Sequence, residues 1–167
     1  MSLELEKQAR YEATRLGGLR RQFTKYKPLS SNVQLDDAVA IVTGSNVGLG
    51  LEASRELLQL GLSNLIMGVR SEEKGNRAAD ALRRDFPRAT ISVWIIDIES
   101  YNSIREFAER CATLRRIDIV ILNAAIAPNP SFTPVTGTGH ELSMQVNYLS
   151  TALLDILLLP ILKAKKQ

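Results

Sequence analysis

The stretch that decides the fold is VAIVTGSNVGLG, residues 39–50. The β-branched apolar run 39–43 predicts a strand and meets glycines at positions 44, 48 and 50. The following residues 51–58, LEASRELL, predict a helix. Glycines permit a tight turn and let the backbone approach an anion, while the first N–H groups and the dipole of a helix hold negative charge. The combination of a strand, a glycine turn and a helix N-terminus therefore predicts a phosphate-binding site.

Strand and helix patterns alternate along the rest of the chain. Apolar runs predict further strands at 65–69, 91–96 and 117–122, and helices are expected at 71–86, 101–114 and 140–163. Near-continuous apolar strands separated by helices indicate a parallel sheet buried on both faces. With right-handed crossovers and a phosphate-binding first strand, the chain is predicted to form an α/β, Rossmann-type parallel sheet of strand order 3-2-1-4, flanked by helices on both faces and missing the usual later strands.

Composition limits the possible classes of protein. The 167 residues suffice for one domain, and 45% hydrophobic with 23% charged residues fits neither a disordered chain nor a membrane protein. The apolar run 148–162 contains Asp155 and Pro160 and is too short to span a bilayer, so no transmembrane segment is expected. A single cysteine, Cys111, excludes an internal disulfide and favours a cytoplasmic location, and the single His140 cannot build a metal site.

Positive charge is concentrated at the N-terminus. Residues 1–28 carry seven basic and three acidic residues, a net +4, so the remainder of a chain with net charge +3 sums to −1. That distribution argues against a nucleic-acid surface on the domain. We therefore divide the chain into a basic arm, residues 1–35, and a phosphate-binding Rossmann-type domain, residues 36–167. The arm is expected to be solvated with Phe23 packed on the domain; a role in binding a partner or an anionic surface is the alternative.

The end of the second strand predicts which dinucleotide binds. A dinucleotide site of this fold binds the adenosine ribose there, and an acid at that place would accept a hydrogen bond from the 2′-hydroxyl of NAD. Here the strand ends in Gly68, Val69 and Arg70, without an acid. A guanidinium suits a 2′-phosphate, because it is always charged and binds bidentately. We therefore predict NADP(H), with Lys74 adding charge. The alternative is that Arg70 is simply an exposed residue at a strand end.

Three further polar positions follow strands or interrupt a helix. Asp97, after the third strand, is placed to accept a hydrogen bond from an adenine amino group, or else it caps the following helix. Asn123 and Ala124 follow the fourth strand, where small residues let the backbone lie against a ribose, or they form only a tight turn. Asn147 interrupts an apolar helix, where a buried amide needs a hydrogen-bond partner. That partner could be backbone alone.

These motifs together resemble the short-chain dehydrogenase/reductase family. Residues 43–50 resemble its TGxxxGxG signature, residues 123–125 its NNAG motif, and residues 145–147 the helix that carries its catalytic asparagine, here Asn147. The sequence is most similar to fungal members of the family and to its retinol-dehydrogenase-like branch. Many of the fungal members serve secondary-metabolite pathways. The resemblance implies a cofactor site made of Gly44, Ser45, Asn46, Gly48, Leu49, Gly50, Arg70, Lys74, Asp97, Ile98, Asn123 and Ala124.

The chain departs from that family in its proton-transfer groups. The family uses a tyrosine as general acid/base, a lysine four residues later and a serine, on a fifth strand and helix. The four tyrosines here are followed four residues later by Arg15, Ser30, Arg105 and Ala152, so no YxxxK is present. The sequence ends at Gln167, before a fifth strand. We therefore expect a truncated cofactor half, without the Ser/Tyr/Lys part.

Three hypotheses remain open. The first is that the chain descends from NADP-dependent carbonyl/alcohol oxidoreductases and is itself an inactive fragment. An active form would act on a small-molecule carbonyl or alcohol substrate. The second is a non-catalytic NADP-binding protein that forms a homo- or heterodimer through its last helix. The third is completion of the site by a separate C-terminal polypeptide. The predicted strand 117–122 would be an exposed sheet edge in each, unless a partner covers it.

Overall fold

The structure is a computed structural model that describes residues 33–127 and 131–165, together with residues 14, 16, 19, 20 and 23. The chain divides into two compact units, residues 1–33 and 34–167. The predicted basic arm, residues 1–35, falls almost wholly outside the described residues. The fold presented below is that of the second unit.

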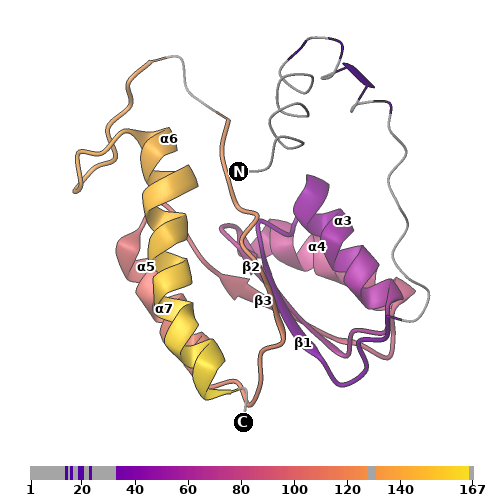
Figure 1. The fold of residues 1–167 in the computed structure, drawn as a ribbon. Helices are drawn as coiled ribbons and strands as arrows, with labels where there is room; N and C mark the ends of the chain where they lie inside the picture. Colours follow the sequence, from indigo (N-terminus) through magenta and orange to yellow (C-terminus); the bar gives the residue numbers. More distant parts are fainter. Residues whose placement is uncertain are drawn as a thin grey trace, which may run out of the picture. The chain divides into compact units, whose positions relative to one another are not determined.

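A four-stranded parallel sheet forms the centre of this unit (Figure 1). Its strands are β1 (Val39–Thr43), β2 (Asn64–Val69), β3 (Thr90–Ile95) and β4 (Ile119–Ile121). They lie in the order β3-β2-β1-β4, which confirms the predicted Rossmann-type topology. In this register Val42 pairs with Met67 and with Ile121, so the carboxyl ends of all four strands meet at one edge.

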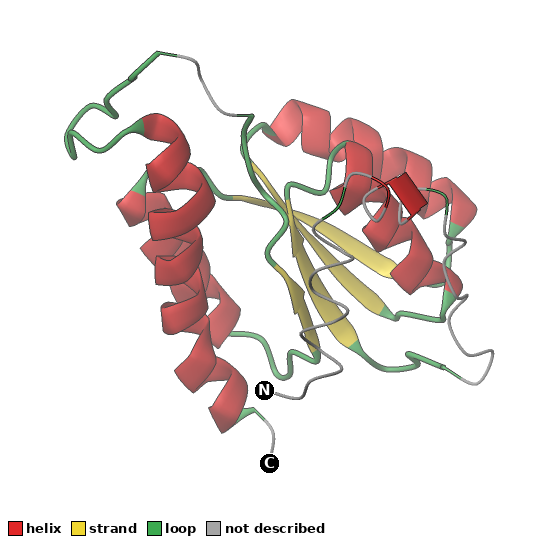
Figure 2. Ribbon diagram, turned by 45° about the horizontal axis from the view of Figure 1, so that its top comes forward, coloured by secondary structure: helices red, strands yellow, loops and turns green. Residues whose placement is uncertain are grey.

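Helices cover both faces of the sheet (Figure 2). They are α3 (Gly48–Gln59), α4 (Glu72–Asp85), α5 (Tyr101–Ala112), α6 (Leu142–Met144), the π-helix η1 (Gln145–Ser150) and α7 (Thr151–Ala164). Helices α3 and α4 pack on one face, and α5 with η1 and α7 on the other. The helix starts follow the sequence closely: Ser71 is the N-cap of α4, as expected, and Ser100 is the N-cap of α5.

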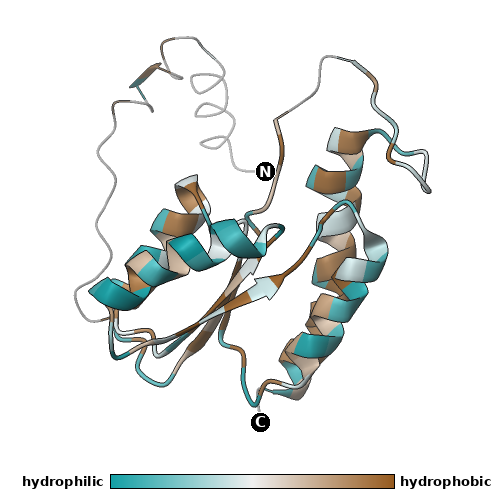
Figure 3. Ribbon diagram, turned by 180° about the vertical axis from the view of Figure 1, so that it is seen from behind, coloured by the Kyte–Doolittle hydropathy of each residue, from teal (hydrophilic) through white to brown (hydrophobic). Residues whose placement is uncertain are grey.

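The strands bury side chains on both faces. In β1, Val39 and Ile41 face the core under α5 and α7, whereas Ala40 and Val42 face the core under α3 and α4. This two-residue alternation with apolar residues on both sides explains the near-continuous apolar strands of the sequence. Figure 3 shows the result as mostly hydrophobic strands beside helices of mixed hydropathy.

Strand β4 is shorter than predicted. The sequence predicts residues 117–122, but the structure has three residues, because side chains replace ladder hydrogen bonds at both ends. The Asp118 carboxylate accepts the N–H of Val39 at 2.8 Å, and the Thr43 hydroxyl accepts the N–H of Asn123 at 3.0 Å. Among the described residues β4 pairs only with β1, so it is an edge strand as expected.

The final helix differs from the prediction in its geometry, and it extends beyond the apolar run 148–162 at both ends. It is helical from Leu142 to Ala164, close to the predicted 140–163, but residues 145–150 form a π-helix. The apolar run considered for membrane insertion had 15 residues, whereas this continuous helix has 23 and is apolar and long enough to cross a membrane. Core helices of soluble proteins meet the same criterion, so length and composition are weak evidence for a membrane span.

Candidate functional site

Two glycines of the turn after β1, Gly44 and Gly50, have no room for a side chain. Gly44 has φ of 65°, a left-handed conformation that favours glycine, and a Cβ there would lie 2.9 Å from the Cα of Ala124. A Cβ on Gly50 would overlap the carbonyl oxygen of Gly44 and lie 2.5 Å from Nδ2 of Asn123. The start of α3 is therefore pressed against the turn and the end of β4, and only glycine at position 50 permits this contact.

The N-terminus of α3 lacks the capping that the other helices of the sheet have. Its N-cap residue is Val47, which offers no side-chain acceptor, and its first turn contains no acid. By contrast, Ser71 and Ser100 accept backbone N–H groups at the starts of α4 and α5. An uncapped helix N-terminus presents N–H donors and the positive end of the helix dipole. These donors are suited to hold the phosphate that the sequence predicts.

Two side chains hold the glycine turn against the end of β4. The buried Thr43 hydroxyl accepts the N–H groups of Asn123 at 3.0 Å and Ala124 at 3.1 Å. In return Nδ2 of Asn123 donates to the carbonyl oxygens of Thr43 at 3.1 Å and Gly44 at 3.3 Å. The amide of Asn123 therefore ties adjacent strands together, and the small side chain of Ala124 lets the two turns approach.

A cavity of about 310 Å³ opens at this carboxyl edge of the sheet. The predicted site residues that line it come from all four strand ends: Gly44, Asn46, Arg70, Asp97, Ile98, Asn123 and Ala124. Other predicted residues do not line it: Ser45, Gly48, Leu49, Gly50, Lys74 and Asn147. Gly48 and Gly50 belong to the helix start, Leu49 is 83% exposed, and the hydroxyl of buried Ser45 has no hydrogen-bond partner among the described residues.

Arg70 lines the cavity and forms an ion pair with Glu99 there. Its Nη1 lies 2.7 Å from Oε1 of Glu99, and the two side chains are 68% and 36% exposed. Arg70 is thus an exposed strand-end residue that also lines the cavity. Lys74 lies in the first turn of α4, where its backbone N–H donates to the Ser71 hydroxyl at 3.4 Å, and its side chain is exposed.

Asp97 organises the loop after β3 without capping a helix. Its carboxylate accepts the N–H of Glu99 at 3.0 Å, and its own N–H donates to the Ser103 hydroxyl at 2.9 Å. Because Ser100 is the N-cap of α5, the alternative that Asp97 caps the helix is wrong. Asp97 lines the cavity instead.

Asn147 is linked to the cavity by hydrogen bonds to the backbone of Ile126. Its Nδ2 donates to the carbonyl oxygen of Ile126 at 2.9 Å, and its Oδ1 accepts the Ile126 N–H at 2.9 Å. Ile126 lines the cavity, so Asn147 is placed as a positioning residue. The expectation that Asn147 is buried is wrong, because η1 presents it at the surface. Both of these hydrogen bonds join it to the backbone of Ile126, in the segment that follows β4.

Sequence reasoning missed three residues that organise this site. Thr43 belongs to the signature, but no role is predicted for it from the sequence. A hydroxyl at the end of a strand, directly before a glycine turn, indicates a side chain that can hold the turn by hydrogen bonds. Glu99 follows Asp97 by two residues, and only the pairing of β2 with β3 brings it to Arg70. Gln145 is fully buried; it donates to the carbonyl oxygen of Glu99 at 2.7 Å and hydrogen-bonds the Thr138 hydroxyl. No local pattern indicated that link.

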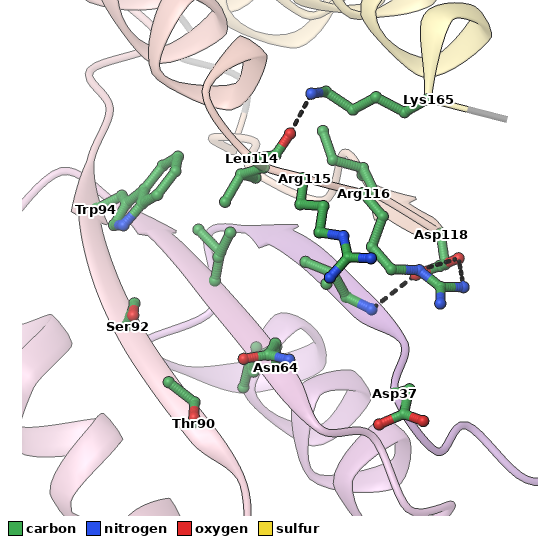
Figure 4. A pocket seen from close by; sticks show the side chains of 14 residues that line it. Asp37, Asn64, Thr90, Ser92, Trp94, Leu114, Arg115, Arg116, Asp118 and Lys165 are labelled. Atoms are coloured by element: carbon green, nitrogen blue, oxygen red, sulfur yellow. Dashed lines mark hydrogen bonds and ion pairs between the residues drawn. The ribbon is translucent and has the colours of Figure 1, made fainter. Parts of the chain in front are cut away.

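A larger hollow of about 1010 Å³ lies at the opposite edge of the sheet (Figure 4). Two of its cations already serve the fold: Arg116 pairs with Asp118 at 2.5 Å, and Lys165 donates to the carbonyl oxygens of Ala112 and Leu114. These contacts hold the start of β4 and the end of α7 in place. The hollow therefore contrasts with the carboxyl edge, where glycines and an uncapped helix leave donors available.

Comparison with known proteins places this geometry in a family. The family model described as short chain dehydrogenase matches residues 38–167. The short chain dehydrogenase virL of Hypocrea virens is 66% identical over 167 residues, covering 100% of this chain and 49% of that protein. The short chain dehydrogenase/reductase mfmJ of Annulohypoxylon moriforme is 52% identical over 146 residues, covering 87% and 42%. The chain spans about half the length of the curated relatives it matches.

Solved structures agree with the fold assignment. A short chain dehydrogenase from Escherichia coli CFT073, complexed with NADPH, is 27% identical and superposes with a TM-score of 0.63. The match covers 77% of this chain and 55% of that chain. Since the family model spans well over half of the sequence, and the strand order and glycine turn agree with it, this chain belongs to the short-chain dehydrogenase/reductase family of oxidoreductases.

Proposed function

We propose that this chain binds NADP(H) at the carboxyl edge of its sheet, as the cofactor half of an NADP-dependent carbonyl/alcohol oxidoreductase of fungal secondary metabolism. The observation that carries the proposal is the uncapped start of α3 beside a glycine turn in which positions 44 and 50 have no room for a Cβ. A pyrophosphate is the chemical group that such a turn accommodates, and a related protein has been solved with NADPH.

The remaining residues of the cavity would bind the adenosine end. Arg70 is assigned to the 2′-phosphate, with Lys74 adding positive charge from α4, and Asp97 is assigned to the adenine amino group. Asn123 and Ala124 would let the backbone after β4 lie against a ribose, and Asn147 would hold the adjacent backbone through Ile126. The bound cofactor supplies the hydride.

The proton-transfer step is not assigned to these 167 residues. They contain no YxxxK, and the chain spans about half of its curated relatives. We propose that this part binds and orients the cofactor. A small-molecule carbonyl or alcohol is the proposed substrate of the whole protein, and the cytoplasm is its proposed location.

A second candidate function is a dimerising, non-catalytic NADP-binding protein. The observation in its favour is an exposed apolar face on the last helix, formed by Met144, Tyr148, Ile156 and Leu159. Their spacing places them along one side of the helix. A concentration-dependent dimer that binds NADPH but reduces no carbonyl would favour this function.

The test is a thermal-unfolding titration with NADPH, NADP⁺, NADH and NAD⁺, followed by the fluorescence of the single Trp94, which is buried. A ligand that binds only the folded state stabilises it by about 2.7 kcal/mol at 100 times its Kd. We expect saturable stabilisation, stronger with NADPH than with NADH, and we expect Arg70→Gln to remove the difference. Arg77→Gln is the matched control, because Arg77 pairs with Glu73 on the exposed side of α4. If none of the four nucleotides raises the Tm, the proposal is wrong.

A further inference from the structure

The cation assigned to the 2′-phosphate already has an anionic partner inside the same cavity. Arg70 directly follows β2 and Glu99 lies four residues beyond the end of β3, and both line the cavity at the carboxyl edge. Nη1 of Arg70 lies 2.7 Å from Oε1 of Glu99. A phosphate that approached Arg70 would therefore meet a carboxylate at hydrogen-bond distance from the same guanidinium.

The backbone of Glu99 is fixed on two sides. Its N–H donates to Oδ1 of Asp97 at 3.0 Å, and its carbonyl oxygen accepts Nε2 of the fully buried Gln145 at 2.7 Å. Movement of this loop away from Gln145 would break the second hydrogen bond. While the backbone stays in place, the ion pair separates by rotation of the Arg70 or the Glu99 side chain, and the carboxylate stays near the cavity.

We infer that Glu99 is a specificity-determining residue that lowers the preference for NADP(H) over NAD(H). This inference rests on the proposed function. A 2′-phosphate carries close to two negative charges, so it must displace Glu99 from Arg70 and is repelled by the carboxylate. A 2′-hydroxyl meets no such repulsion and can donate a hydrogen bond to Glu99, as it would to the acid that usually follows the second strand in NAD sites.

Calorimetric titration of the whole chain and its Glu99→Gln variant tests this inference. The probes are NADPH and NADH, together with adenosine 2′,5′-bisphosphate and AMP, which differ only by the 2′-phosphate. Because exposed ion pairs are weak, we expect Glu99→Gln to tighten NADPH and the bisphosphate by about two- to fivefold. NADH and AMP should bind equally well or more weakly. Glu73→Gln is the matched control: it removes the same charge, from the pair with Arg77, and should change none of the four affinities.

The Arg70→Gln background separates a direct effect from a structural one. If Glu99 acts by holding Arg70, Glu99→Gln should gain less for NADPH in that background than in the unmodified chain. Glu99→Ala, which also lacks the carboxylate, should change the NADPH-to-NADH ratio in the same direction. An unchanged ratio in both variants, with NADPH still bound, overturns this inference and leaves the proposed function standing. Failure of the unmodified chain to bind any probe overturns the proposed function and the inference together.

Discussion

Thr43 holds two backbone N–H groups at the end of β4 with one hydroxyl oxygen. These donors, on Asn123 and Ala124, have the Thr43 hydroxyl as their partner, and Thr43 itself is 1% exposed. Thr43→Val keeps the shape of the side chain but leaves both donors without an acceptor. We expect the free energy of unfolding to fall by about 2 kcal/mol, within the range for unsatisfied buried donors. Urea unfolding followed by Trp94 fluorescence measures this change.

The control for this prediction is Thr43→Ser, which keeps the hydroxyl and removes only the methyl group. It should lower the free energy of unfolding by about 1 kcal/mol, the value of one buried methyl group. If Val and Ser lower the stability equally, then packing and not the shared hydroxyl holds the turn to β4.

Gly50 tests whether the close approach of α3 to the turn matters for binding. In Gly50→Ala the new methyl group meets the Gly44 carbonyl oxygen and the Asn123 amide, so the turn must shift. We expect a loss of about 1–3 kcal/mol in unfolding free energy, typical of overpacking, and at least tenfold weaker NADPH binding. Gly61→Ala at the other end of α3, where φ is 90°, is the control. It should lower stability without changing the NADPH affinity, and equal binding by both variants would contradict the assignment of the turn.

The start of β4 depends on one ionised side chain. Burial raises the pKa of Asp118. Hydrogen bonds from Arg116 and from the Val39 N–H, together with the positive charge of Arg116, lower the pKa by more than burial raises it. The pKa of Asp118 therefore lies below its usual value of 3.8. A carboxyl with a lowered folded-state pKa binds protons more readily when unfolded. Its contribution to stability is therefore present above about pH 4 and is lost as the pH falls through the folded-state pKa.

Asp118→Asn should accordingly flatten the acid side of the stability profile. We expect the variant to be less stable than the unmodified chain at pH 6, and the difference to shrink as the pH falls below 4. Urea midpoints measured between pH 6 and pH 2.5 test this. Asp155→Asn, exposed on α7 and far along the chain, removes the same charge and should leave the shape of the profile unchanged. A pH-independent difference for Asp118→Asn would contradict the ion-pair explanation.

The elements that could be predicted from sequence are those whose signals are local. The bounds of β1 match the prediction because its apolar run ends at the glycines, and α4 begins where Ser71 supplies its N-cap. The length of β4 depended instead on side chains of Thr43 and Asp118, about 80 residues from the backbone groups that they bind. The π-helix could not be predicted, because residues 145–150 fit an α-helical pattern equally well.

The same distinction explains the candidate site. Residues that end strands, such as Arg70 and Asp97, were predicted because carboxyl ends of parallel strands share an edge. Which of their side chains contact each other depended on three-dimensional packing. The contact between Arg70 and Glu99 and the attachment of Glu99 to Gln145 therefore appeared only in the structure.

Cys111 reports on the stability of the whole four-stranded unit. It lies on α5 in the core beneath the sheet, is fully buried, and is the only cysteine of the chain. Burial raises the pKa of its thiol to about 12, although the charge of Arg110 opposes this shift. Since the thiolate is the reactive form, the folded protein should react slowly with a disulfide reagent at pH 8, and reaction should require opening of α5.

We therefore expect modification of Cys111 to be coupled to nucleotide binding at the carboxyl edge of the sheet. In urea just below the unfolding transition, NADPH should slow the reaction by about one plus the ratio of the NADPH concentration to its Kd, the factor by which it lowers the unfolded population, and NADH should slow it less. The fully unfolded chain, which reacts at one thiol per molecule, gives the reference rate. Rapid reaction in water while Trp94 fluorescence remains native would show that α5 opens locally. In that case the labelling rate would be independent of NADPH, and the four-stranded unit would not unfold as one cooperative structure.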